Sequence, residues 1–566
     1  MALQMQKNPA FGWPGALPHW ARADKSGVGT ARSLSSEVWF TAAGGVITEV
    51  YYPDVDSPQI LDLQLLVTDG ATFFHDGKRD FNSVCQPIAS DALGLHLVNT
   101  AIGQSYVVIQ DVIAEPGSSC LLVRTQLQGA RGFLTGLHVY VLLAPHLNGY
   151  GSGNTWLALD ADCGFRMTGL GYVGVNDGWQ DIIAHRRLPI WNFDSATNGN
   201  IALTAEIDLS GQTEFVFALA FGQGAAPQLL AGVSGYDPGP NGALVTLSEA
   251  LSYPFEAAAG EYSHLSLFLS GWKDVNKNRF QPKPQTTFDQ GRLFNISRNV
   301  LLSHEDKIYN GALVASLGIP WGESAGDRAG GYHLVWPRDM CQSATALLAS
   351  GEVDLALRGL MYLAASQAPD GSVFQNFYIN GAPFGHCEQL DEFAFPIILA
   401  YRVSLAGALQ RFGPRPMVLA AAGALIANGP MTRQERWEEN EGYSPSTLAS
   451  NIAGLVCAAH FASQKQQDQI TAQFLLDHAD FLETHIEPWT VTTQGTLLPQ
   501  VQRHYIRLLP THVKSGARDP IQVEDPNTAF IDIANGGGLH PAKDVVDAGF
   551  LELVRYGVRP ATRSID

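Results

Sequence analysis

The spacing of apolar residues changes once along this chain, and that change limits the folds open to it. From residue 36 to about residue 272, apolar and polar residues alternate, as in Thr213 to Phe221 and His264 to Ser270. Alternation of this kind predicts half-buried β-strands. Beyond about residue 300, apolar residues recur at the spacing of an α-helix. We therefore expect a large antiparallel β-sandwich followed by a helical part.

The length of the chain fits two domains. With 566 residues it exceeds one ordinary domain. Polar residues and prolines separate the two patterns, which is typical of a linker. We expect a β domain at residues 1–272, a linker at 273–299 and a helical domain at 300–566. The candidate helices are Gly291 to Ser316, Met340 to Ser350, Val353 to Gln367, Leu390 to Leu405, Met417 to Asn428, Pro445 to Ser463, Gln466 to Ile486 and Ala542 to Gly557.

Charge and cysteine content exclude several kinds of partner. The formal net charge is −19, and no run rich in Lys or Arg occurs, which argues against nucleic acid or an anionic membrane. The six cysteines show no CxxC pair, so we expect buried free thiols, no metal and no cofactor. The amino terminus lacks the apolar core of a signal peptide, and no run reaches membrane-span length. As written the chain would stay in the cytoplasm; removal of a leader would allow export.

One short segment carries the candidate chemistry. Trp437, Glu438 and Glu439 precede an apolar helix that a proline opens at Pro445. Cleavage of a glycosidic bond needs a carboxyl group that is still protonated near neutral pH, and an apolar or like-charged neighbourhood raises the pKa of such a group. Trp437 and Glu439 could provide both influences on Glu438. On these residues alone, a solvated helix start is the simpler interpretation.

An ordered set of motifs gives a more specific signal. The motifs are Gly27-Val28-Gly29-Thr30-Ala31, Glu49-Val50-Tyr51-Tyr52-Pro53, Trp336-Pro337-Arg338-Asp339, Gln389-Leu390-Asp391-Glu392, Trp437-Glu438-Glu439-Asn440, Tyr505-Ile506-Arg507-Leu508 and Asp547-Ala548-Gly549-Phe550. Together they resemble the bacterial glucoamylase and glucodextranase family of inverting glycoside hydrolases, over nearly the whole chain. The resemblance implies a β-supersandwich, a linker and a catalytic (α/α)6 barrel that acts on the non-reducing ends of α-glucans.

The same resemblance assigns roles to individual residues. It makes Glu438 the general acid, and Glu439 the group that hydrogen-bonds the sugar beyond the cleavage point. The remaining residues that it implies for substrate binding are Tyr332, Trp336, Arg338, Asp339, Gln389, Asp391, Trp437 and Arg507. Planar polar groups and aromatic faces suit a neutral sugar. Purely structural roles stay open as alternatives. Arg338 and Asp339 could form a buried ion pair, and Trp336 and Tyr332 could be core aromatics.

Two features depart from the family pattern. Gly385 stands where the family usually has a tryptophan, so linkage preference stays open. An inverting hydrolase also needs a second carboxylate, about 6.5 to 9.5 Å from the acid, to activate water, and the family segment that carries this base has no match here. A closed barrel needs twelve helices, whereas the pattern predicts eight. We therefore expect a truncated chain with an incomplete barrel, or a second polypeptide that completes it.

Three functions are compatible with these observations. The favoured one is an exo-acting inverting α-glucoside hydrolase that releases β-glucose. A glycoside phosphorylase of the same architecture would need only one carboxylic acid, because phosphate is its nucleophile. A carbohydrate-binding fragment without catalysis is the third. None of the three requires a protein or nucleic-acid partner beyond a chain that completes the barrel.

Overall fold

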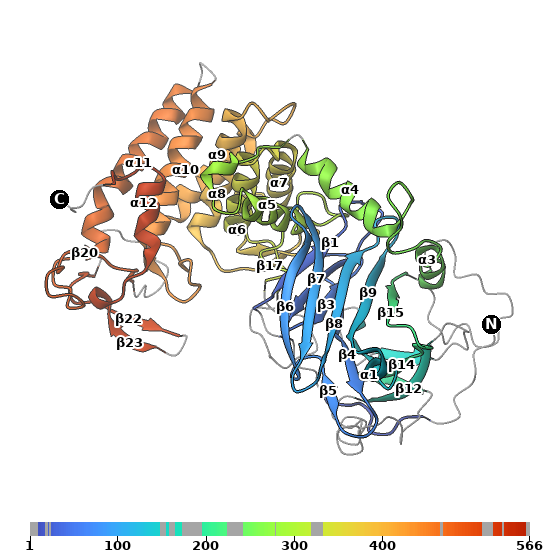
Figure 1. The fold of residues 1–566 in the computed structure, drawn as a ribbon. Helices are drawn as coiled ribbons and strands as arrows, with labels where there is room; N and C mark the ends of the chain where they lie inside the picture. The colour runs from blue at the N-terminus through green and yellow to red at the C-terminus, as the bar shows by residue number, and fades with distance from the viewer. Residues whose placement is uncertain are drawn as a thin grey trace. The chain divides into compact units, whose positions relative to one another are not determined.

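The computed structural model describes two compact units. The described residues are 9–16, 21, 24–147, 154–157, 165–172, 195–223, 242–277, 279–318, 332–464, 468–511, 524–534 and 537–561. One unit comprises Met1–Ile308 and Ser316–His333, and the other comprises Tyr309–Ala315 and Leu334–Asp566. The first is built mainly of strands and the second mainly of helices (Figure 1). The predicted order of fold classes is therefore confirmed.

Two antiparallel sheets dominate the first unit. The larger has the strand order β1-β2-β3-β4-β10-β14-β12, with β5 paired to β4, and the smaller runs β15-β9-β8-β7-β6, as Figure 1 shows in part. A short pair, β11 and β13, accompanies them. The strands are β1 (Gly27–Thr30), β2 (Trp39–Ala43), β3 (Val46–Tyr51), β4 (Pro58–Thr68), β5 (Phe74–Asp76), β6 (Phe81–Ala89), β7 (Ala92–Ala101), β8 (Tyr106–Ala114), β9 (Cys120–Gly129), β10 (His138–Pro145), β11 (Asn154–Leu157), β12 (Phe165–Tyr172), β13 (Ser195–Gly199), β14 (Ile201–Ile207) and β15 (Glu214–Ala220).

Apolar side chains from both sheets share one core. Val67 of β4 and Val139 of β10 belong to the same buried cluster as Tyr106, Val108 and Leu127 of the smaller sheet. Side chains alternate between the two faces of a strand, so each sheet presents one apolar face to this cluster. The first unit is therefore a sandwich, as the alternating pattern predicts.

One predicted strand is wrong. The segment from His264 to Ser270 lies in helix α4 (His264–Asn276), which is preceded by α1 (Arg131–Leu134) and α3 (Ala243–Ala250). Leucine and serine alternate there by coincidence. The helix begins at a capping box. The Ser263 hydroxyl accepts from the backbone N–H of Ser266, and the Ser266 hydroxyl accepts from the backbone N–H of Ser263.

The expected linker at residues 273–299 is partly helical. It holds the end of α4, a 3-10 turn at Pro284–Thr286 and the start of α5 (Arg292–Ser303). All three belong to the first unit, which changes over to the second only between residues 308 and 334. The predicted boundaries of 1–272 and 300–566 stay a proposal.

Helices of the second unit pack as successive neighbours. They are α6 (Pro337–Ala349), α7 (Val353–Ser366), α8 (Leu390–Leu405), α9 (Arg415–Asn428), α10 (Pro445–Ser463), α11 (Gln469–Thr490) and α12 (Leu551–Arg555). Helices α6, α8 and α10 form an inner row, because α8 packs on both of the others. Helix α8 is buried from Leu390 to Ala400, and α7, α9 and α11 each pack beside an inner helix (Figure 1).

Short strand pairs join the helices of this unit. The pairs are β16 (Asn376–Phe377) with β17 (Pro383–Gly385), β18 (Gly442–Tyr443) with β21 (Leu509–Pro510), β19 (Val491–Thr492) with β20 (His504–Tyr505), and β22 (Phe530–Ile533) with β23 (Gly538–Pro541). The β18–β21 pair holds the chain directly before α10. It therefore fixes the loop that carries the candidate acid.

Two helix predictions need correction. The helix expected from Gly291 to Ser316 ends at Ser303. The helix expected from Ala542 to Gly557 is split into two 3-10 turns, η4 (Ala542–Asp544) and η5 (Ala548–Phe550), followed by the short α12. The split occurs because Asp547 adopts an extended backbone and its side chain accepts from the N–H of Gly549.

The cysteines in the described part of the chain are free thiols. Cys387 is exposed and Cys85 and Cys457 are only partly buried, which corrects the expectation that all would be buried. Cys163 lies outside the described residues. In the same part of the chain, no helix combines the length and apolar character that crossing a membrane requires.

Candidate active site

The candidate residues gather where inner helices begin. Arg338 and Asp339 stand in the first turn of α6, Gln389 directly precedes α8, and Glu438 lies in the loop before α10. Prolines at the first position of α6 and α10 favour helix starts there. Helix amino-terminal ends carry partial positive charge, so this region favours carboxylates.

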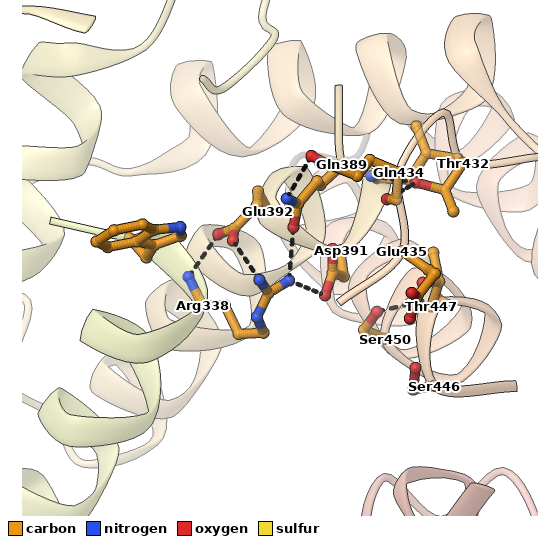
Figure 2. Close-up of polar contacts among 12 residues, drawn as sticks. Arg338, Gln389, Asp391, Glu392, Thr432, Gln434, Glu435, Ser446, Thr447 and Ser450 are labelled. Atoms are coloured by element: carbon orange, nitrogen blue, oxygen red, sulfur yellow. Dashed lines mark hydrogen bonds and ion pairs between the residues drawn. The ribbon is translucent and has the colours of Figure 1, made fainter. Parts of the chain in front are cut away.

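The Arg338 side chain is the centre of a polar network (Figure 2). Its Nη1 donates to Gln389 Oε1 over 2.9 Å and to Asp391 Oδ2 over 2.6 Å. Its Nη2 lies 3.3 Å from Glu392 Oε1, while its backbone N–H donates to Glu392 Oε2 over 2.5 Å. Burial acts to lower the pKa of Arg338, but the Asp391 and Glu392 carboxylates outweigh it and raise that pKa overall. Arg338 therefore stays charged and fixed in orientation.

Asp339 differs from the buried carboxylates beside it. It is exposed to solvent, although desolvation by the surrounding protein raises its pKa, against the effect of Arg338. Asp391 and Glu392, in contrast, are almost fully buried and face Arg338. Of these three carboxylates, Asp339 is therefore the one placed to accept hydrogen bonds from a bound hydroxyl group.

Glu438 is held through one oxygen. Its Oε1 accepts from Trp336 Nε1 over 3.0 Å and from Gln389 Nε2 over 3.3 Å, and Arg338 Nη2 lies 4.0 Å from the same atom. About a third of the side chain is exposed, at 34%. Within the described part of the chain, Oε2 has no hydrogen-bond partner. One carboxylate oxygen is thus fixed, and the other is free to carry a proton.

The backbone at Glu438 has an unusual conformation. Its φ of 63° lies in the left-handed region, which costs energy for a residue with a side chain. Two hydrogen bonds maintain it, from the Glu438 N–H to the Glu435 carbonyl over 2.8 Å and from Gln434 Nε2 to the Glu438 carbonyl over 2.7 Å. Gln434 also accepts from Gln389, which ties the loop to α8 (Figure 2). Such strain is common at functional positions.

The predicted influence of Trp437 and Glu439 on Glu438 stays a prediction. In the structure, the polar side-chain atoms of both residues bond to other groups. Arg507 Nη2 donates to Glu439 Oε2 over 2.8 Å and to the buried Glu435 Oε1 over 2.6 Å. The Trp437 indole donates to Asp547 Oδ2 over 2.7 Å.

Nine of the ten predicted site residues lie in the second unit. Hydrogen bonds, ion pairs or ring contacts connect eight of them in two groups, which are Trp336, Arg338, Gln389, Asp391 and Glu438, and Trp437, Glu439 and Arg507. Asp339, the ninth, directly follows Arg338 in α6. Tyr332 belongs to the first unit, so its predicted role stays a prediction. Gln389 and Asp391 are buried and contact Arg338, rather than forming an open surface.

Sequence reasoning missed four residues of this network, Glu392, Gln434, Glu435 and Asp547. Glu392 and Asp547 stand inside quoted motifs, and Glu435 precedes Glu438 by three residues. A signal was therefore present for these three. Burial raises the pKa of Glu435, although Arg507 opposes this effect.

Comparisons with known proteins agree with this geometry. Residues 10–276 match the family model of glucodextranase domain N, and residues 292–565 match that of glycosyl hydrolases family 15. A glucoamylase from Clostridium sp. (strain G0005) is 35% identical over 575 aligned positions, which cover 97% of this chain and 75% of that protein. A crystal structure of a bacterial glucoamylase complexed with acarbose superposes with a TM-score of 0.84 and 33% identity, covering 99% of this chain and 79% of that one.

Proposed function

The chain belongs to glycosyl hydrolases family 15 and is a glucoamylase, an exo-acting α-glucan hydrolase; from that premise we propose that Glu438 is its general acid. The observation that carries this proposal is that the two carboxylate oxygens of Glu438 differ in their hydrogen bonds. Trp336 and Gln389 donate to Oε1, which orients the group, and Oε2 keeps its lone pairs for a proton. Oε2 then donates that proton to the departing glycosidic oxygen.

Arg338 and Asp339 hold the terminal sugar in this mechanism. The network around Arg338 restrains its guanidinium before substrate arrives, so little side-chain entropy is lost on binding. Asp339 is exposed and accepts hydroxyl groups of the sugar. Gln389 and Asp391 contribute indirectly, through the position of Arg338.

The substrate is an α-glucan or a malto- or isomalto-oligosaccharide. The similar bacterial glucoamylase was crystallised with acarbose, which supports an equivalent site here. We therefore expect acarbose to inhibit this chain competitively. Linkage preference between α-1,4 and α-1,6 depends on residues near Gly385 and is measured by comparing maltose with isomaltose.

Water attacks from the face opposite Glu438, and β-glucose leaves with inverted configuration. This step needs a carboxylate that is free to accept a proton. Asp391, Glu392, Glu435 and Glu439 are each engaged by an arginine. We propose that the base comes from outside this set.

The two alternatives to hydrolysis are a glycoside phosphorylase and a non-catalytic protein. Family membership favours hydrolysis over phosphorolysis. The non-catalytic alternative is tested with Glu438→Gln, which keeps the shape of the side chain but cannot donate the proton of a carboxylic acid. We expect activity to fall by about 10²- to 10⁴-fold. Glu388→Gln is the matched control, because it makes the same change at a carboxylate that lies 3.6 Å from Arg433.

The stereochemistry is tested by proton NMR of the first product. β-Glucose as the initial anomer supports the proposal, and α-glucose would contradict it. A requirement for inorganic phosphate, with a sugar phosphate as product, would instead identify a phosphorylase.

A further inference from the structure

Trp437 is an exposed aromatic side chain with an anchored edge. Half of it is open to solvent, at 51% exposure, although it directly precedes the proposed acid. Its Nε1 donates to Asp547 Oδ2 over 2.7 Å. The guanidinium groups of Arg507 and Arg436 lie 5.4 and 5.8 Å from its ring centroid. The indole therefore has a defined plane before any ligand binds.

Asp547 is itself held firmly. Its Oδ1 accepts from the Gly549 N–H over 2.8 Å, which caps the η5 turn. Its Oδ2 takes the Trp437 N–H and also lies 3.2 Å from Arg436 Nη2. Only 12% of the side chain is exposed. Asp547 thus links the segment before α12 to the loop that carries Glu438, across 110 positions of sequence.

We infer that Asp547 is a positioning residue that orients the Trp437 indole as a platform for the sugar beyond the cleavage point. This inference rests on the proposed role of Glu438. Sugar rings pack their C–H faces on aromatic rings, and a ring that is already fixed loses less entropy on binding. Arg507 links the platform to Glu439, since it contacts the Trp437 ring and donates to Glu439.

The Asp547→Asn variant separates this role from simple capping. Asparagine keeps one carbonyl oxygen, which can still accept from the Gly549 N–H. Its amide NH₂ then faces the Trp437 N–H and the Arg436 guanidinium. All three groups are hydrogen-bond donors, so no hydrogen bond forms between them. The η5 cap survives in this variant, while the anchor of the indole is lost.

The experiment compares two substrates of the full chain. α-Glucosyl fluoride has no sugar beyond the cleavage point, whereas maltotriose has two. We expect Asp547→Asn to raise KM for maltotriose about 10-fold, as one charge-assisted hydrogen bond implies. Its kcat/KM for α-glucosyl fluoride stays within about twofold of wild type.

Asp544→Asn is the matched control. Asp544 Oδ1 accepts from the backbone and hydroxyl of Thr496, so this variant also loses a loop carboxylate but leaves Trp437 untouched. We expect it to treat both substrates as wild type does. In addition, the effects of Asp547→Asn and Trp437→Phe on maltotriose are expected to be non-additive, because both remove the same hydrogen bond.

Equal losses on both substrates, or additive effects in the double variant, would overturn the inference and leave the proposed function in place. A wild-type chain that hydrolyses neither substrate would overturn the proposed function, and this inference with it.

Discussion

The indole N–H of Trp336 donates to Oε1 of Glu438 over 3.0 Å, although 102 residues separate the two in sequence. This bond fixes which carboxylate oxygen is engaged and leaves the other for the proposed proton transfer. Trp336→Phe removes the donor and keeps an aromatic ring. We expect kcat to fall about 10-fold with a smaller change in KM, since a hydrogen bond to a neutral carboxyl group contributes roughly 0.5–1.5 kcal/mol. Steady-state kinetics on maltose measure this, and Trp489→Phe, the same change at a buried indole elsewhere in the second unit, is the control.

Arg338→Lys tests the polar network. Lysine has no planar fork and cannot serve Gln389, Asp391 and Glu392 together. Buried carboxylates would lose a partner, so we expect the free energy of unfolding to fall by roughly 3 kcal/mol. Urea titration followed by circular dichroism measures the change. Arg555→Lys, at an exposed pair with Glu552, should cost less than about 0.5 kcal/mol, and a similar loss in both variants would contradict the network.

Gly442→Ala tests the support of the acid loop. Gly442 has a φ of 150° and pairs with Thr432 and Pro510, and a Cβ atom there would collide with the Leu509 carbonyl oxygen. We expect a loss of about 1–3 kcal/mol and reduced activity. Gly423→Ala provides the opposite control. That glycine lies on the exposed side of α9 with open space around it, so alanine should stabilise the helix by about 0.5–1 kcal/mol. Calorimetry distinguishes the two directions.

Asp56→Asn tests pH dependence in the first unit. Burial, together with Asp54 and Asp306, raises the pKa of Asp56 to about 7 in the folded chain. The folded state therefore binds more protons than the unfolded state, and this carboxyl reduces stability as pH rises from about 4 to about 7. Asparagine cannot ionise. We expect the variant to melt about 2–4 °C above wild type at pH 8, and no higher than wild type at pH 4.

Asp69→Asn is expected to change the melting temperature in the opposite direction. Slight burial acts against it, but the Thr72 hydroxyl and three backbone N–H groups lower the pKa of Asp69. Its contribution is present at neutral pH and is lost on acidification. The variant should therefore melt below wild type at pH 7 and approach it in acid. Parallel pH profiles for the two variants would contradict both assignments.

Much of the fold could be predicted because local patterns agree with burial. Leu390 to Leu405 was predicted as a helix to the residue, and its continuous apolar run reflects an inner position in the second unit. The segment from His264 to Ser270 misled, because a serine cap decides its conformation and an alternating pattern does not reveal the cap.

The candidate site could be predicted only in part. Motifs identified Glu438, Arg338 and Asp339, because each belongs to a short ordered signature. The partners of Glu438 could not be inferred, since the direction of a side chain in a loop depends on contacts with distant segments. The left-handed backbone of Glu438 and the turn of Trp437 toward Asp547 are both of this kind.

The hydrogen bonds around Glu438 join residues at the starts of three separate helices, and this affects the time course of folding. Trp336, Gln389 and Glu438 reach their places only when α6, α8 and α10 have all docked. A refolding chain would regain secondary structure before it regains turnover. The time at which turnover returns would thus mark when the last of these helices docks. Stopped-flow measurements of circular dichroism and of turnover would show the interval between the two events.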